Sequence, residues 1–214
     1  MIITCLGHSK FLLELESGLR IVTDPFDAST GYPIHPLRAD AVTVSHGHGD
    51  HSAVDTVQGW TQVVDTEGEH TLAPDVRIRS LRSFHDDCGG KKRGPNLIHC
   101  LDAESMHVVH LGDLGHVPDA ELARKIGPVD ILMIPVGGFY TIDAAAAREV
   151  CTLLAPRIIL PMHYRTKYNA DWPISGPEDF LSLFPQKAEE LNLLRVVKED
   201  LACQMHLALL VPQV

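Results

Sequence analysis

The stretch Ser45-His46-Gly47-His48-Gly49-Asp50-His51 follows the apolar run 41–44 and contains three imidazoles and one carboxylate within six residues. The intervening glycines let a tight loop turn these side chains toward one point. His46 and His48 can bind one metal ion, while Asp50 and His51 face a second ion about 4 Å away. The alternative is a solvated histidine-rich turn. A metal site at the end of a strand is the interpretation that the spacing favours.

Three further candidate ligands each come directly after a predicted strand: His85, Asp113 and His163. A layered fold collects residues from strand ends that are distant in sequence into one site. Taken singly, His85 or His163 could be a hydrogen-bonded core histidine, and Asp113 could belong to a turn or a helix cap. Together with the histidine cluster, they supply the ligands that a two-ion site still needs.

Hydrophobic periodicity predicts strands that come first and then alternate with helices. The expected strands cover 2–6, 10–15, 20–24, 41–45, 61–65, 75–84, 96–101, 106–111, 129–135, 157–161, 193–198 and 203–211. The expected helices cover 51–59, 118–126, 143–154 and 177–191, with an interruption near Pro185 in the last. This order predicts an α/β fold with two packed sheets and helices outside them, in a single domain over 1–214.

The composition narrows the class of protein. The chain has 214 residues and a formal net charge of -10, which disfavours nucleic acid as a partner because such binding depends on basic side chains. No apolar run is long enough for a membrane span, and the amino-terminal residues do not resemble a signal peptide, so we expect a cytoplasmic protein without integral membrane association. The five cysteines are scattered without a C-x-x-C pair, which fits a reducing compartment: Cys5, Cys88, Cys100, Cys151 and Cys203.

The ordered set H-x-H-x-D-H (46–51), His85, Asp113 and His163 resembles the metallo-β-lactamase superfamily. Further motifs are similar to its branch of small metal-dependent hydrolases related to L-ascorbate-6-phosphate lactonase and, more distantly, to the phospholipase D that acts on N-acyl phosphatidylethanolamine. These motifs are Leu6-Gly7-His8-Ser9, Asp24-Pro25, Gly112-Asp113-Leu114-Gly115-His116, Pro135-Val136-Gly137-Gly138 and Pro161-Met162-His163-Tyr164. The resemblance implies an αββα sandwich, in which two mixed β-sheets carry helices on their outer faces and a binuclear metal site lies between the sheets.

Carried over residue by residue, the resemblance implies two divalent ions, with Zn²⁺ as the leading candidate and Mn²⁺ or Fe²⁺ as alternatives. The first would be held by His46, His48 and His85, the second by Asp50, His51 and His163, and both by Asp113. It further implies a hydrolase whose metal-bridged hydroxide attacks an ester-like bond in a lactone or phosphoester. The alternative from another class is a non-catalytic, metal-containing protein that binds or senses a ligand.

The resemblance also implies roles for residues around the metals. Asp50 could orient the hydroxide as a catalytic group, and Asp24 could orient a ligand histidine, with a plain Asp-Pro turn as its alternative. His8 could contact substrate or a ligand, or be structural.

Because the site would carry net positive charge, we expect a small, anionic substrate. The loop 86–95 after His85 offers Lys91, Lys92 and Arg93 as substrate contacts, with a solvated loop as the alternative. Tyr140 and Tyr164 could line the same pocket or pack in the core. Assembly into a homo-oligomer is left open.

Overall fold

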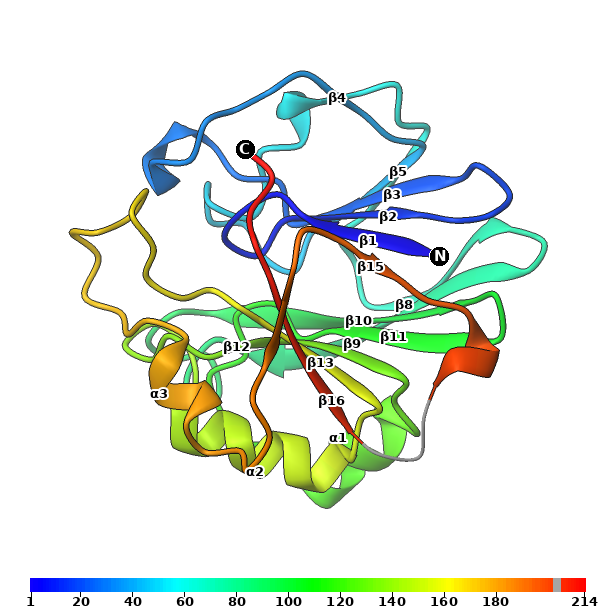
Figure 1. Cartoon of the computed structure of the whole chain (residues 1–214). Helices are drawn as coiled ribbons and strands as arrows, with labels where there is room; N and C mark the ends of the chain where they lie inside the picture. Colours follow the sequence, from blue (N-terminus) through cyan, green and yellow to red (C-terminus); the bar gives the residue numbers. More distant parts are fainter. Residues whose placement is uncertain (202–204) are drawn as a thin grey trace.

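Two β-sheets lie face to face in the computed structural model, which describes residues 1–201 and 205–214 (Figure 1). Among these residues, the first sheet has the spatial order β15 (Leu194–Arg195), β1 (Ile2–Cys5), β2 (Phe11–Glu14), β3 (Arg20–Thr23), β5 (Ala41–Thr43) and β7 (Gln62–Val64). The second has the order β14 (Glu189–Leu191), β16 (His206–Leu210), β13 (Ile158–Met162), β12 (Ile131–Pro135), β11 (Met106–His110), β10 (Pro95–Ala103), β9 (Val76–Phe84) and β8 (Gly68–Ala73).

Both sheets are mixed, as predicted. In the first, β15, β1, β2 and β3 are antiparallel neighbours, and β3, β5 and β7 are parallel. In the second, β8 to β11 are antiparallel, and β11, β12, β13, β16 and β14 are parallel. Every residue of β12 and β13 is buried. Their nearly continuous apolar sequences are therefore those of parallel strands that are covered on both faces.

The α-helices that the structure describes cover the outer face of the second sheet: α1 (Ala120–Ile126), α2 (Ala144–Leu154) and α3 (Glu178–Leu181) (Figure 1). The helices expected over 118–126 and 143–154 are confirmed, each within two residues. They begin where Asp119 and Asp143 accept hydrogen bonds from backbone N–H groups in the first turn. In α2, the side chains of Ala147, Val150, Cys151 and Leu154 face the sheet at helical spacing.

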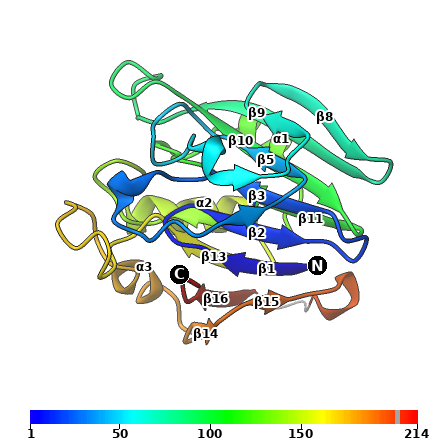
Figure 2. The same ribbon diagram turned by 90° about the horizontal axis from the view of Figure 1, so that it is seen from above.

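The outer face of the first sheet is covered differently. Apolar side chains of β2, β3 and β5 pack there against β4 (Leu37–Arg38), β6 (Val57–Gln58) and the one-turn 3₁₀ helix η2 (Val54–Thr56). Figure 1 shows β4 above the first sheet, and Figure 2, seen from above, shows β1, β2, β3 and β5 of that sheet side by side. The expected helix over 51–59 is wrong, because only Val54–Thr56 form a single 3₁₀ turn and the backbone is extended from Val57, whose β-branched side chain favours that conformation.

Near the carboxyl end, the helix expected over 177–191 is confirmed only at its start, as α3. α3 ends at Leu181, before Pro185, and 189–191 form β14, which pairs with β16. The strand expected over 193–198 shortens to β15, and 198–200 form the 3₁₀ helix η3 (Lys198–Asp200). The strand expected over 203–211 is observed as β16, while 203 and 204, with Cys203, lie outside the described residues.

The loops that follow β5, β9, β11 and β13 meet at one end of the sandwich, at the left in Figure 1. Because each of these strands continues directly into a predicted ligand, the topology places His46, His85, Asp113 and His163 at the same end. The core between the sheets draws side chains from strands at both ends of the chain, including β1 and β16. No helix in the described part of the chain is long and apolar enough to cross a membrane.

Candidate metal centre

The structure brings together all seven residues that the sequence analysis assigns to metal: His46, His48, Asp50, His51, His85, Asp113 and His163. Their ligand atoms form overlapping groups within which all atoms lie within 4.8 Å of one another. One group contains His46, His48 and His85, and another contains His46, His51 and Asp113. A third contains His8, Asp50, His51 and His163, so His8 lies closer to the candidate ligands than expected.

The Asp113 carboxylate lies between the groups. Its Oδ2 is 3.1 Å from His85 Nε2 and 3.2 Å from His163 Nε2. Its Oδ1 is 3.2 Å from His51 Nε2. Ligand atoms arranged tetrahedrally around zinc at about 2.1 Å are roughly 3.4 Å from one another. The separations at Asp113 are close to this spacing, so its carboxylate and the three histidines could hold metal together.

The donor set fits divalent cations. His8 Nε2 is 3.2 Å from His51 Nε2, and His46 Nε2 is 3.0 Å from His48 Nδ1. Each such pair of imidazole nitrogens can share one proton at most. Among the described residues, the buried His163 Nε2 makes no well-aligned hydrogen bond, although it lies 3.2 Å from Asp113 Oδ2. Converging nitrogen lone pairs and carboxylate oxygens without enough protons between them are suited to a cation.

Burial favours the ligand form of two histidines. It lowers the pKa of His8 to about 4, and the nearby His163 imidazole acts in the same direction. Burial, followed by proximity to His51, lowers the pKa of His46 to about 3. Both imidazoles are therefore neutral at pH 7, and a neutral imidazole is the form that binds a metal ion.

Asp24 links Ser45, the neighbour of His46, to His51. Its fully buried carboxylate accepts hydrogen bonds from the Ser45 backbone N–H at 2.7 Å and the Ser45 hydroxyl at 2.6 Å. It also lies 2.9 Å from His51 Nδ1. Burial alone would raise the pKa of Asp24, but His110 and the hydrogen bond from His51 lower it below its usual range. Ionised Asp24 therefore holds the His51 ring with Nε2 toward Asp113.

Asn96 is a positioning residue that the sequence analysis missed. Its Oδ1 accepts a hydrogen bond from the Asp113 backbone N–H at 2.8 Å, and its Nδ2 donates to the Leu111 carbonyl at 2.9 Å. Gly112, with φ of 56°, lies directly against Asn96, and a Cβ there would collide with both Asn96 and Ser45. No local motif marks Asn96, since its role arises only when β10 pairs with β11.

Backbone strain is concentrated at this end of the molecule. His8, Asp24 and His163 have φ values of 53°, 36° and 52°, in the left-handed region that such residues rarely adopt. Each position costs of order 1–3 kcal/mol unless its surroundings hold it in place. The His163 backbone N–H donates to the His8 carbonyl at 3.2 Å and so joins the two strained segments. The strained backbone positions thus lie where the candidate ligands come together.

The expected substrate contacts have different surroundings. Arg93 donates from Nη2 to the Phe139 carbonyl at 2.8 Å, and its Cζ lies 5.9 Å from the centre of the Tyr140 ring. Lys92 pairs with Asp87 at 3.1 Å. Lys91 is exposed.

The two tyrosines also differ. Tyr140 lies 6.5 Å from His163, ring centre to ring centre. Tyr164 is 8% exposed in the core cluster with residues of α2 and α3, where burial raises its pKa well above the usual value. The packing alternative therefore describes Tyr164.

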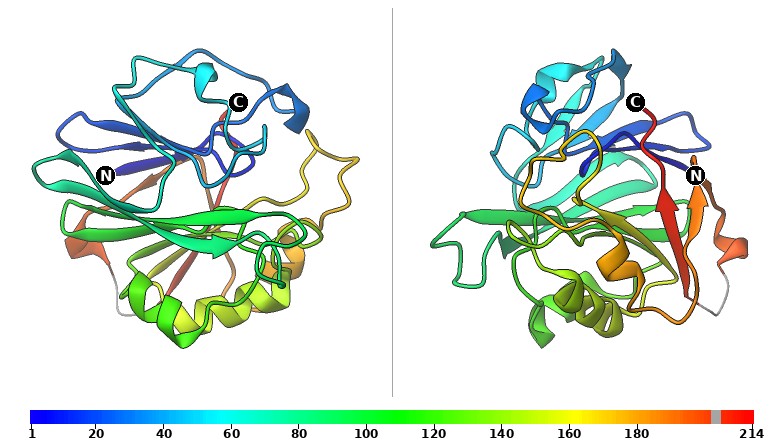
Figure 3. Two further views of the ribbon diagram at one scale, coloured as in Figure 1. Left: turned by 180° about the vertical axis from the view of Figure 1, so that it is seen from behind. Right: turned by 60° about the vertical axis from the view of Figure 1, so that its left-hand side comes forward.

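Trp172 was not anticipated. Its ring lies edge-on to His8 with ring centres 5.4 Å apart, and its centre is 6.4 Å from that of His163. The segment 164–176 that carries it lies beside loop 26–32, as Figure 3 shows, where Tyr32 and Tyr168 rings are 4.8 Å apart. The isolated tryptophan in this irregular segment gave no periodic signal that could have marked it.

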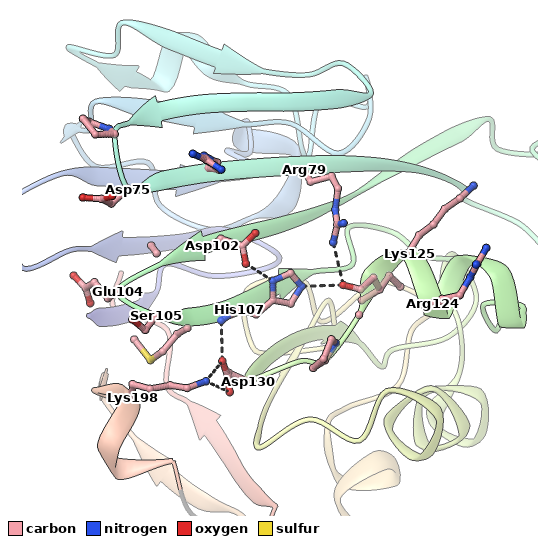
Figure 4. A pocket seen from close by; sticks show the side chains of 17 residues that line it. Asp75, Arg79, Asp102, Glu104, Ser105, His107, Arg124, Lys125, Asp130 and Lys198 are labelled. Atoms are coloured by element: carbon pink, nitrogen blue, oxygen red, sulfur yellow. Dashed lines mark hydrogen bonds and ion pairs between the residues drawn. The ribbon is translucent and has the colours of Figure 1, made fainter.

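A cavity of about 990 Å³ lies at the opposite ends of β9, β10 and β11 (Figure 4). None of its lining residues belongs to the candidate metal site. Its polar groups largely bind one another: His107 Nδ1 is 2.6 Å from Asp102, and Lys198 Nζ is 2.7 Å from Asp130. The candidate metal ligands thus lie at the other end of these strands, away from this cavity.

The comparisons with known proteins agree with the fold and the ligand pattern. A family model described as a β-lactamase superfamily domain matches residues 2–163. A UPF0173 metal-dependent hydrolase of Thermococcus onnurineus is 30% identical, with 88% of this chain and 94% of the relative covered. Its counterpart in Pyrococcus furiosus is 29% identical, with 89% and 95% covered.

Solved structures give the same result. A Thermotoga maritima protein, named as a Zn-dependent hydrolase of the metallo-β-lactamase superfamily, has a TM-score of 0.80 and 38% identity over 98% of this chain and 97% of its own. An isothiocyanate hydrolase from Delia radicum gut bacteria, at 14% identity, shares the fold with a TM-score of 0.65 over 86% and 91% of the two chains. The chain therefore belongs to the metallo-β-lactamase superfamily. Within it, the chain is a metal-dependent hydrolase similar to the UPF0173 proteins.

Proposed function

We propose that this hydrolase cleaves an ester-like bond, in a lactone or a phosphoester, at a site for two divalent ions. The observation that carries the proposal is the position of the Asp113 carboxylate, within 3.2 Å of His51, His85 and His163. A carboxylate in this position can serve two ions at once, as a binuclear hydrolytic site requires.

In the proposed site, two sets of donor atoms would share Asp113. His46, His48 and His85 would hold the first ion. Asp50, His51 and His163 would hold the second, with His8 within reach of it. When bound, two such ions supply Lewis-acid chemistry and lower the pKa of water toward neutrality. The imidazole-rich set without thiolate suits Zn²⁺, and Mn²⁺ or Fe²⁺ are the alternatives.

The residues of the chain prepare the site for an anionic substrate. Two carboxylates among neutral imidazoles leave the loaded site with net positive charge, which attracts a phosphate or carboxylate. Asp50 is the candidate proton carrier, because its carboxylate lies 3.5 Å from His51 Nε2 and its side chain is 22% exposed. Asp24, buried beneath the site, would hold His51 in place.

The domain organisation, the cellular location and the oligomeric state belong to the same proposal. We propose a single domain over 1–214, supported by an inter-sheet core that draws residues from both ends of the chain. The cytoplasm is the proposed location, in keeping with the four described cysteines, which are all free. A homo-oligomer remains compatible with this function.

Elemental analysis of protein purified without added metal, followed by hydrolysis of a panel of lactones and phosphodiesters, tests the proposal. We expect about two ions per chain and metal-dependent activity that His48→Ala removes. His70→Ala is the matched control, because His70 is bonded to the Thr66 carbonyl outside the site. Fewer than one ion per chain would contradict the two-ion site. Two bound ions without hydrolysis of any substrate would favour the ligand-binding alternative.

A further inference from the structure

Two aromatic side chains that metal binding does not use stand beside the second set of candidate ligands. The rings of Trp172 and Tyr140 meet edge to face with centres 5.9 Å apart, and both rings lie near His163. Both side chains are partly exposed. We call this pair the aromatic wall. It presents ring surface next to the ligand atoms, where a bound substrate must lie.

A positively charged side chain lies against the Tyr140 ring of the aromatic wall. The Arg93 guanidinium lies over the Tyr140 ring and donates to the Phe139 carbonyl. The Arg93 backbone N–H donates to the Asp86 carboxylate at 2.8 Å, which anchors this part of the loop. In residues 1–201 and 205–214 no carboxylate forms an ion pair with Arg93, whereas neighbouring Lys92 is paired with Asp87. Arg93 therefore has guanidinium N–H donors available for an anion.

The two neighbours of Tyr140, which are His163 and Arg93, define what the aromatic wall can bind. Tyr140 has both groups as neighbours: its ring centre is 6.5 Å from that of His163 and 5.9 Å from Arg93 Cζ. A flat apolar group packed on the wall would bury ring area and make edge-to-face or stacked contacts. A carboxylate or phosphate beyond that group would meet the guanidinium, which pairs with either anion through two parallel hydrogen bonds.

Building on the proposed function, we infer that the aromatic wall and Arg93 form a substrate subsite. The substrate class is an ester or phosphoester with an aromatic or flat apolar group next to the scissile bond and an anionic substituent beyond it. Trp172 and Tyr140 would contact the apolar group, and Arg93 the anion. The competing explanation is that Trp172 only supports the rings of His8 and His163.

Binding of substrate-like anions to the metal-loaded protein tests this inference, with metal content determined first. The probes are methylphosphonate, phenylphosphonate and 4-carboxyphenylphosphonate, measured by titration calorimetry. We expect phenylphosphonate to bind about tenfold more tightly than methylphosphonate. The carboxylate should add a further few-fold gain, which Arg93→Gln removes without changing the phenyl preference. Equal affinities for the methyl and phenyl probes would overturn the inference.

A matched pair of variants separates the subsite from mere support of the ligands. Trp172→Leu should abolish most of the phenyl preference while methylphosphonate affinity and metal content stay near those of the parent. Trp60→Leu makes the same change at a 41% exposed tryptophan next to β6 and should leave the preference intact. If Trp172→Leu weakens both probes equally, or lowers metal content, Trp172 is a supporting residue and the inference fails.

Fluorescence locates the binding, since the chain has two tryptophans and Trp60→Phe leaves Trp172 as the single reporter. Phenylphosphonate should quench its emission more than methylphosphonate does at equal occupancy, and equal quenching would contradict contact with the ring.

The calorimetric titration is repeated on chelated protein, where the ratio of the phenylphosphonate and methylphosphonate affinities should persist although both affinities fall. Loss of the ratio there contradicts the aromatic wall. Loss of metal from the untreated protein contradicts the two-ion site instead.

Discussion

The buried carboxylate of Asp24 shows how a residue outside the ligand set can control it. Its oxygens accept from Ser45 and face His51 Nδ1. Asp24→Asn replaces one carboxylate oxygen with an NH₂ group, which would face the donor groups of Ser45 or His51 instead of accepting from them. We therefore expect metal affinity to fall by roughly 10–100-fold, as losses of such supporting partners do. Competition titration with a chromophoric chelator measures it.

The control for Asp24→Asn is Asp40→Asn, which alters an aspartate that accepts from the Arg20 backbone N–H away from the site. The control should retain parental metal affinity. If Asp24→Asn retains it as well, Asp24 does not act through His51.

His8 is the residue whose position differs most from expectation. Its Nε2 lies 3.2 Å from His51 Nε2 and 3.4 Å from Asp50 Oδ2, as a ligand of the second ion would. His8→Gln should therefore weaken one of two metal-binding steps by at least roughly tenfold and leave the other unchanged. Calorimetric zinc titration of chelated protein resolves the steps, with His70→Gln as the control. Two unaltered steps would make His8 a neighbour of the metals rather than a ligand.

The ligand pattern could be predicted from the sequence because its members lie in or beside recognisable local motifs. The cluster at 46–51 is contiguous, and His85, Asp113 and His163 each follow an apolar strand. Asn96 and Trp172 could not be predicted in the same way. Their roles depend on contacts with Asp113 and His163 that form only when distant segments meet.

At the scale of elements, the loop that follows β9 is organised around one carboxylate. Asp86 accepts backbone N–H bonds from Cys88, Gly90, Lys92 and Arg93 at 2.8–2.9 Å. Burial would raise the pKa of Asp86, but the hydrogen bonds from Arg93 and Cys88 outweigh it and lower that pKa below its usual value. The ionised carboxylate therefore stabilises the folded loop.

This arrangement predicts a pH dependence. Because the pKa of Asp86 is lower in the folded than in the unfolded chain, its contribution to stability is complete above about pH 4 and is lost as the pH falls toward the folded value. Chelated parent protein should thus have a higher urea midpoint than Asp86→Asn at pH 6, and the gap should narrow between pH 4 and 3. Asp87→Asn should show a much smaller gap, because the Asp87–Lys92 pair that lowers the pKa of Asp87 is exposed to solvent. A gap that stays constant with pH would contradict the role of Asp86.

Elements with strong local signals were predicted well, and elements that depend on edge pairing were not. α2 combines a capping Asp143 with a four-residue apolar face, and β12 and β13 are unbroken apolar strands. By contrast, 189–191 become a strand because β16 offers them an open edge. β8 was missed for the same reason, since its polar sequence is ordered by pairing with β9. Local propensity carries little information about such short edge strands.

At the scale of the whole molecule, the candidate ligands come from both sheets. His8 and the 46–51 cluster follow strands of the first sheet, whereas His85, Asp113 and His163 follow strands of the second. Bound ions would therefore join the two layers at one end, and binding to the folded state alone would stabilise it. At a free metal concentration 1,000 times the dissociation constant, each bound ion adds about 4 kcal/mol. For a chain of this size that corresponds to a rise in Tm of roughly 10 °C.

Scanning calorimetry of metal-loaded and chelated protein measures this coupling between metal binding and stability. Met106→Ala provides the comparison, because Met106 is 2% exposed in the inter-sheet core near the end of β11 remote from the metal site. Met106→Ala should lower the Tm of the loaded and of the chelated form by similar amounts. The cavity that it creates is far from the metal site, so its effect on stability and that of the metal should be additive. His48→Ala should instead reduce the difference between the loaded and chelated forms. Equal Tm values for the parent with and without chelator would mean that the ligands do not join the sheets through metal, and the two-ion site would have to be abandoned.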